Sequence, residues 1–79
     1  MHVVYQTHLT RITGKARATI KIPNSTRFRD ALKTGRNRAR SFAAGPVQVQ
    51  VYKNRLPIQT EIWDRIGGRW VRKFAEYHM

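Results

Sequence analysis

The chain has 79 residues, of which sixteen are Lys or Arg and four are Asp or Glu, and its formal net charge at pH 7 is +12. Residues 1–79 are expected to form a single small basic domain, and the absence of cysteine excludes disulfides, thiolate metal sites and thiol nucleophiles. No apolar run approaches the roughly 20 residues of a membrane span and the N-terminal sequence lacks the pattern of a secretory signal, so we expect a soluble cytoplasmic protein.

Two strands are expected at the start of the chain. Residues 2–10 are rich in β-branched and aromatic side chains, which favours a first strand. Residues 15–22 alternate between Ala or Ile on one side and Lys, Arg or Thr on the other, which predicts a second strand after a turn at Gly14. A strand with one apolar and one cationic face belongs to an antiparallel sheet whose second face is open.

A single helix is expected to follow. Pro23 ends the second strand, and Asn24 or Ser25 is suited to cap a helix that ends near Ala43 or Ala44. Gly35 costs about 1 kcal/mol relative to Ala inside a helix, which indicates either a close approach to a strand or a kink. Apolar and small residues recur at spacings of three and four and form one stripe that should face the sheet: Phe28, Ala31, Leu32, Gly35, Ala39, Phe42 and Ala43.

Three more strands are expected after the helix. Residues 47–52 alternate between inward Val and outward polar side chains, and residues 56–74 contain two β-rich runs around a Gly67-Gly68 hairpin signal, although the chain from Arg69 onward is also compatible with a helical ending. The order ββαβββ predicts a small two-layer α+β domain in which one helix packs on an antiparallel sheet. An edge strand, such as 2–10 or 47–52, would allow a homodimer.

The cations of the predicted helix gather on one side. At about 100° per residue, four of them share a sector beside the apolar stripe. They span about 16 Å of helix axis at 1.5 Å per residue, which is enough to contact several phosphates. A solvated face without a ligand is the alternative, since any amphipathic helix of a basic protein directs its charge away from the core. The four are Arg29, Lys33, Arg36 and Arg40.

A second cationic surface is expected on the open face of the sheet. Polar side chains of the strand at 47–52 can extend this surface with hydrogen-bonding groups, and an ordinary solvated face again remains an alternative. The cations are Lys15, Arg17 and Lys21, and the polar residues are Gln48, Gln50 and Tyr52.

The predicted hairpin combines aromatic and cationic side chains. With its turn at the two glycines, Trp63 lies opposite Arg72 and Arg65 lies opposite Trp70, an arrangement suited to cation–π contacts. Such a patch can stack unpaired bases or anchor a protein partner, and burial of both Trp rings in the core is the alternative. Six side chains should share this face: Glu61, Trp63, Arg65, Trp70, Arg72 and Phe74.

No catalytic residue, metal site or cofactor is predicted. The three histidines, His2, His8 and His78, occur singly, and the four acids are scattered, so Glu61 is better explained by pairing with nearby Arg. A small basic ribonuclease that uses His8 or Glu61 with an Arg is the least favoured hypothesis.

These patterns predict a non-enzymatic nucleic-acid-binding module that holds phosphates of DNA or RNA. Arg outnumbers Lys by eleven to five, and the planar guanidinium suits phosphate. The alternative is a small basic inhibitor or adaptor of the phage type, which acts on host machinery by binding an acidic or nucleic-acid-handling protein, because steering to such a surface uses the same charges. Membrane-surface binding is not expected, since the apolar helix stripe is needed for the core.

Overall fold

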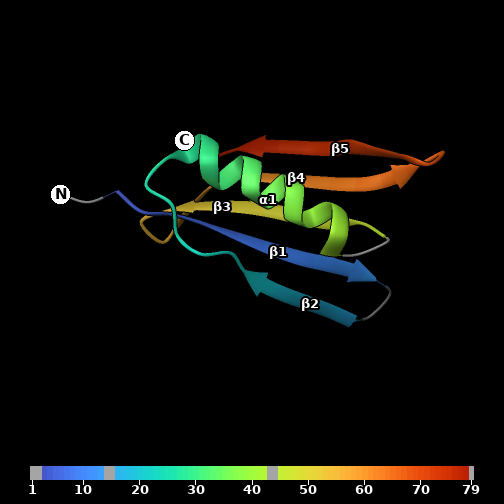
Figure 1. Cartoon of the computed structure of the whole chain (residues 1–79), viewed down its shortest axis with the longest axis horizontal. Coiled ribbons are helices and arrows are strands. Elements are labelled where there is room, and N and C mark those ends of the chain that lie inside the picture. Colours follow the sequence, from blue (N-terminus) through green and yellow to red (C-terminus); the bar gives the residue numbers. More distant parts are fainter. Residues whose placement is uncertain (1–2, 14–15, 43–44, 79) are drawn as a thin grey trace.

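The structure, a computed structural model, describes residues 3–13, 16–42 and 45–78. It has one helix packed on a five-stranded antiparallel sheet, so the predicted α+β class and ββαβββ order are confirmed (Figure 1). Among the described residues, no helix has the length and apolar character needed to cross a membrane. The elements are β1 (Tyr5–Thr13), β2 (Ala16–Lys21), α1 (Phe28–Phe42), β3 (Val47–Lys53), β4 (Leu56–Ile66) and β5 (Arg69–Tyr77).

The strands are arranged in the order β2-β1-β3-β4-β5, so β2 and β5 form the edges of the sheet. The prediction that residues 2–10 or 47–52 lie at an edge is wrong, because β1 pairs with β2 and β3, and β3 pairs with β1 and β4. The central place of β3 agrees with its side chains, since Val47, Val49 and Val51 are fully buried. After β2 the chain passes through α1 and then forms β3, which pairs with the edge of β1 that β2 does not occupy.

The first strand is displaced from its predicted bounds. It begins at Tyr5 and continues to Thr13, because its pairing with β2 extends to Thr13 and Ala16 beside the turn. The turn itself, predicted at Gly14, lies outside the described residues, as does His2.

Two tight turns join the last three strands. Gly67 and Gly68 have positive φ angles of 60° and 80° and connect β4 to β5, as the hairpin signal predicts. Asn54 and Arg55 form the turn between β3 and β4 with φ angles of 48° and 73°. β5 continues as a strand to Tyr77, so the alternative prediction of a helical ending is wrong.

The helix packs through its predicted stripe. Ala31, Gly35 and Ala39 are buried, and the described large residues of the stripe are half-buried, whereas Ala43 lies outside the described residues. A Cβ built on Gly35 would lie 2.5 Å from Cγ2 of Thr7, so the close approach is confirmed, and α1 is one continuous helix rather than two. The helix begins later than predicted, although the Ser25 hydroxyl accepts a hydrogen bond from the Arg27 amide at 3.2 Å.

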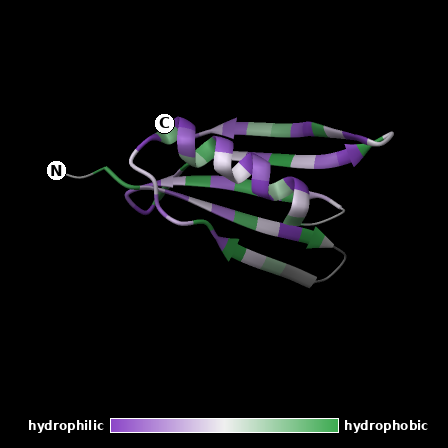
Figure 2. Ribbon diagram, in the orientation of Figure 1, coloured by the Kyte–Doolittle hydropathy of each residue, from purple (hydrophilic) through white to green (hydrophobic). Residues whose placement is uncertain are grey.

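The helix covers only part of the sheet. It packs on β1 and β3, and Figure 1 shows it crossing in front of these strands. Hydrophobic and hydrophilic residues alternate along the strands (Figure 2), so each strand directs one set of side chains to the helix and the other to the open face. Because the helix packs mainly on β1 and β3, the helix-side face of the β4–β5 hairpin lies beside α1, and that face is buried at Gln59 and Glu61 but only half-buried at Trp63 and Trp70.

Candidate functional site

The fold brings together two groups of side chains that the sequence predicts separately. Arg36 and Arg40 of the cationic sector of α1 border the helix-side face of the β4–β5 hairpin. A hollow of about 270 Å³ separates them, lined by Arg36, Asn37, Arg40, Trp63 and Trp70. A second hollow of about 510 Å³ adjoins it at Arg36 and Asn37 and is lined by helix residues alone: Phe28, Arg29, Leu32, Lys33, Arg36 and Asn37. We call these two hollows the α1–hairpin trough.

A buried carboxylate holds the two walls of the trough together. Glu61 of β4 is fully buried and accepts two hydrogen bonds from Arg36, one of them from Nε to Oε1 at 2.9 Å. Trp63 Nε1 donates to the same carboxylate at 2.9 Å, Gln59 Nε2 at 3.0 Å and Arg72 Nη1 at 3.2 Å. The carboxylate therefore connects α1, β4 and β5, and the expected pairing of Glu61 with Arg is confirmed.

The electrostatic state of Glu61 follows from these contacts. Burial raises the pKa of its carboxyl, but the hydrogen bonds from Arg36, Trp63 and Arg72 and the charge of Arg36 outweigh burial and lower the pKa to about 2. The same pairing raises the pKa of Arg36. Glu61 is therefore ionised at neutral pH and offsets charge on two of the predicted site cations.

The aromatic rings lie beside this ion pair. The Trp63 and Trp70 rings stack with centroids 6.2 Å apart at an interplanar angle of 13°, and both pack partly on the core. The predicted cross-strand pairs Trp63–Arg72 and Arg65–Trp70 are confirmed. The Arg65 guanidinium lies 5.6 Å from the Trp70 ring, whereas the cation over Trp63, also at 5.6 Å, comes from Arg36 of the helix.

One member of the predicted hairpin face is misplaced. A β-bulge at Ile62 and Trp63 shifts the register, so that Phe74 pairs with Ile62 rather than following Arg72 in alternation. Phe74 therefore lies on the open face of the sheet, away from Glu61.

The charged groups of the remaining cations are exposed to solvent. Their side chains are exposed, and among the described residues they have no carboxylate within ion-pair distance. Three of the four predicted helix cations therefore differ from Arg36, which is tied to Glu61. The exposed cations are Arg29, Lys33 and Arg40 of the trough and Arg65 of the hairpin, which lies over the Trp70 ring.

The cations predicted on β2 are not part of the trough. Lys21 pairs with His8 of β1 and lies on the open face, on the other side of the sheet from α1. Lys15 and the side chain of Arg17 lie outside the part of the chain that the structure describes.

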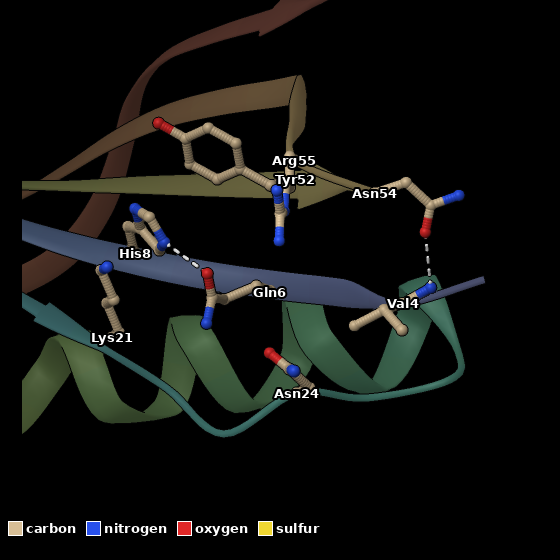
Figure 3. A pocket seen from close by; sticks show the side chains of 8 residues that line it. All are labelled: Val4, Gln6, His8, Lys21, Asn24, Tyr52, Asn54 and Arg55. Atoms are coloured by element: carbon tan, nitrogen blue, oxygen red, sulfur yellow. Dashed lines mark hydrogen bonds between the residues drawn. The ribbon is translucent and has the colours of Figure 1, made fainter. Parts of the chain in front are cut away.

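A polar cleft of about 710 Å³ lies on the open face around Lys21 (Figure 3). The ring of His8 stands 4.4 Å from that of Tyr52, and Gln6 hydrogen-bonds to His8 at 2.8 Å. Burial, aided by the charge of Lys21, lowers the pKa of His8. Tyr52 also donates a hydrogen bond to Gln50 at 2.7 Å, so two of the three polar residues predicted on β3 hydrogen-bond to each other.

Sequence reasoning did not find every residue of these hollows. Asn37 lines both halves of the trough, and its only sequence signal is its place next to Arg36 on the exposed helix face. Arg55 and Asn24 line the open-face cleft from two loops, and no periodicity marks them. Within the described residues, no group of three or more His, Asp or Glu side chains is placed to hold a metal ion.

Comparisons with known proteins add no family to this description. No protein-family model, curated protein or solved structure matches the chain.

Proposed function

We propose that this protein is a non-enzymatic nucleic-acid-binding module that holds the phosphate backbone of a single-stranded segment in the α1–hairpin trough. The observation that carries the proposal is the row of exposed cations on α1 without carboxylate partners, Arg29, Lys33 and Arg40, which ends at Arg40 in the hollow that the two stacked Trp rings also line. Phosphates are held by cations spaced along one direction, and unpaired bases stack on aromatic side chains.

In this proposal the helix wall of the trough contacts phosphates and the hairpin wall contacts bases. The helix presents its three exposed cations along about 16 Å of axis, at 1.5 Å per residue, which matches several successive phosphates. The hairpin presents Trp63 and Trp70, with Arg65 over the second ring. Arg36 and Arg72 are positioning residues in this proposal, because their charge is shared with Glu61. Lys21 is a secondary contact for longer ligands, since it lies on the other face.

The test is binding of labelled single-stranded DNA, single-stranded RNA and duplex DNA, followed by fluorescence anisotropy across a salt series. The trough variant carries Arg29→Gln, Lys33→Gln and Arg40→Gln. We expect it to bind the single strands at least tenfold more weakly, and its log–log salt slope to fall by about two, since each phosphate contact on a single strand contributes about 0.7.

The matched control removes the same number of charges outside the trough. It carries Arg27→Gln, Arg38→Gln and Lys53→Gln, all of which are exposed. We expect this variant to keep most of the affinity. Equal losses in the two variants, or an unchanged trough variant, would contradict the assignment and favour the alternative ligand, an acidic surface of another protein.

A further inference from the structure

The outer edge of β5 is long and unprotected by the helix. The strand has nine residues and lies at the end of the sheet, so its outward backbone groups have no strand partner in the described structure. Every residue except Trp70 is exposed. Large apolar side chains are among them, since Val71 is 38% exposed and Phe74 is 42% exposed. Such an edge is a template for pairing with another strand.

The bulge in the hairpin changes which side chains of β5 share a face of the sheet. In a regular strand, residues of one face are separated by even numbers of positions. The extra residue of β5 opposite Ile62 and Trp63 changes this rule, so that Arg69 and Val71 share the open face with Phe74 and Glu76. The β5 strand of a second copy can therefore pair with this strand in antiparallel orientation, across a twofold axis that passes between Arg72 and Lys73. In that pairing, the residues that lie opposite each other on either side of the axis belong to the same face of the sheet.

In that register, the side chains of the open face are complementary. Arg69 lies opposite Glu76 of the second copy, and Val71 lies opposite Phe74 of the second copy. Both contacts occur twice because the axis repeats them. Among the described residues, Arg69 has no carboxylate partner of its own, and Glu76 has only His78, 3.1 Å away.

The charges next to the axis do not oppose this pairing. Arg72 lies next to Lys73 of the second copy at the axis, but each of these cations already pairs with an acid of its own β4. Arg72 Nη1 lies 3.2 Å from Glu61, and Lys73 Nζ lies 4.0 Å from Asp64. The two cations also lie on opposite faces of the strand, since Glu61 faces the helix and Asp64 faces away from it.

We propose that two copies of this chain form a dimer by antiparallel pairing of their β5 strands, with Arg69 of each copy against Glu76 of the other. The sheet then continues through both copies, and both helices lie on the same side. The floor between the two helices consists of the β4–β5 hairpins, which lie beside the main contacts of α1 with β1 and β3 in each copy.

Sedimentation velocity or light scattering across a concentration series tests the dimer, with nucleic acid removed beforehand. We expect a mass near twice 9.3 kDa at high concentration. Arg69→Glu and Glu76→Arg should each raise the dissociation constant at least tenfold, because each places like charges opposite each other. The double variant Arg69→Glu/Glu76→Arg should restore dimerisation.

Net charge provides the control within this set. Starting from +12, Arg69→Glu gives +12 − 2 = +10 and Glu76→Arg gives +12 + 2 = +14, while the double variant keeps +12. General repulsion predicts opposite shifts for the two single variants, whereas the specific pair predicts a loss in both. A protein that stays monomeric at all concentrations, a dimer that neither variant weakens, or shifts that follow net charge would overturn the proposal. Circular dichroism and thermal unfolding establish that each variant is folded.

Discussion

At the scale of single residues, Glu61 organises the trough. It is fully buried and accepts five hydrogen bonds from the side chains of Arg36, Gln59, Trp63 and Arg72. A buried carboxylate is tolerated only when it is paired and hydrogen-bonded, and here the donors come from three elements. Glu61 thereby fixes the orientation of a guanidinium and an indole that are 27 residues apart in the chain.

Replacement of this carboxylate should be costly. We expect Glu61→Gln to lower the free energy of unfolding by about 2–3 kcal/mol, because the neutral amide accepts fewer hydrogen bonds and leaves Arg36 and Arg72 without a counterion. Urea denaturation measures the loss. The control is Asp64→Asn, whose 4.0 Å contact with Lys73 is partly exposed and should be worth less than about 1 kcal/mol. Similar losses in both variants would contradict the central role of Glu61.

The same residue should give the protein an acid-sensitive stability. The pKa of Glu61 is lowered to about 2 in the folded protein, below its ordinary value of 4.5, so the folded state binds the proton less readily than the unfolded state. The stabilisation is therefore present above about pH 5 and is lost as the pH falls towards 2. Thermal unfolding across this range should show a smaller decrease for Glu61→Gln than for the wild type. Parallel profiles would show that other carboxyls dominate.

At the scale of elements, the contact between α1 and the sheet depends on one missing side chain. Ala is intrinsically better than Gly in a helix by about 1 kcal/mol, yet the Cβ of Gly35→Ala would lie 2.5 Å from Cγ2 of Thr7 and 3.2 Å from Cγ1 of Val49. We expect this variant to lose about 1–3 kcal/mol of unfolding free energy through overpacking.

A second substitution tests the cause of that loss. Thr7→Ser removes the methyl group that Ala would meet and keeps the hydroxyl that donates to the carbonyl of Ala31 at 3.0 Å. The double variant Gly35→Ala/Thr7→Ser should recover part of the stability lost by Gly35→Ala, as measured by a double-mutant cycle in urea. Strict additivity of the two changes would show that steric contact with this methyl group is not the cause.

The elements themselves could be predicted where the pattern is local. The alternation at Val47, Val49 and Val51, the helix stripe around Gly35 and the glycine pair at the hairpin each determine structure within a few residues. The order of the strands could not be predicted, because it depends on which strand β3 pairs with after the helical connection, and no local pattern encodes that choice. Phe74 was misplaced for a related reason, since a bulge has no signal in a single strand.

The candidate site shows the same division. The cationic sector of the helix and the Trp and Arg pairs of the hairpin follow from periodicity and pairing. Their meeting in one trough depends on packing across 25 residues, between Arg36 and Glu61, and no local pattern encodes that distance. Periodicity also cannot tell which cation of a sector has a partner, so Arg36 is indistinguishable in sequence from Arg40.

At the scale of the whole molecule, a net charge of +12 on 79 residues opposes compaction. Screening weakens this repulsion, since the Debye length falls from about 30 Å at 0.01 M salt to about 10 Å at 0.1 M. We therefore expect the melting temperature to rise by several degrees between these two concentrations of sodium chloride, as measured by circular dichroism. A fall would mean that screening of the ion pairs outweighs the relief of repulsion.

The stacking of Trp63 and Trp70 in the trough has an optical consequence. The chain contains two tryptophans, and both lie there with their rings 6.2 Å apart. Their ultraviolet emission therefore originates entirely from the candidate site. A ligand that enters the hollow lined by these rings should alter the intensity or wavelength of this emission, whereas one that binds the open-face cleft should leave it nearly unchanged. The protein thus carries its own unlabelled reporter of which face is occupied.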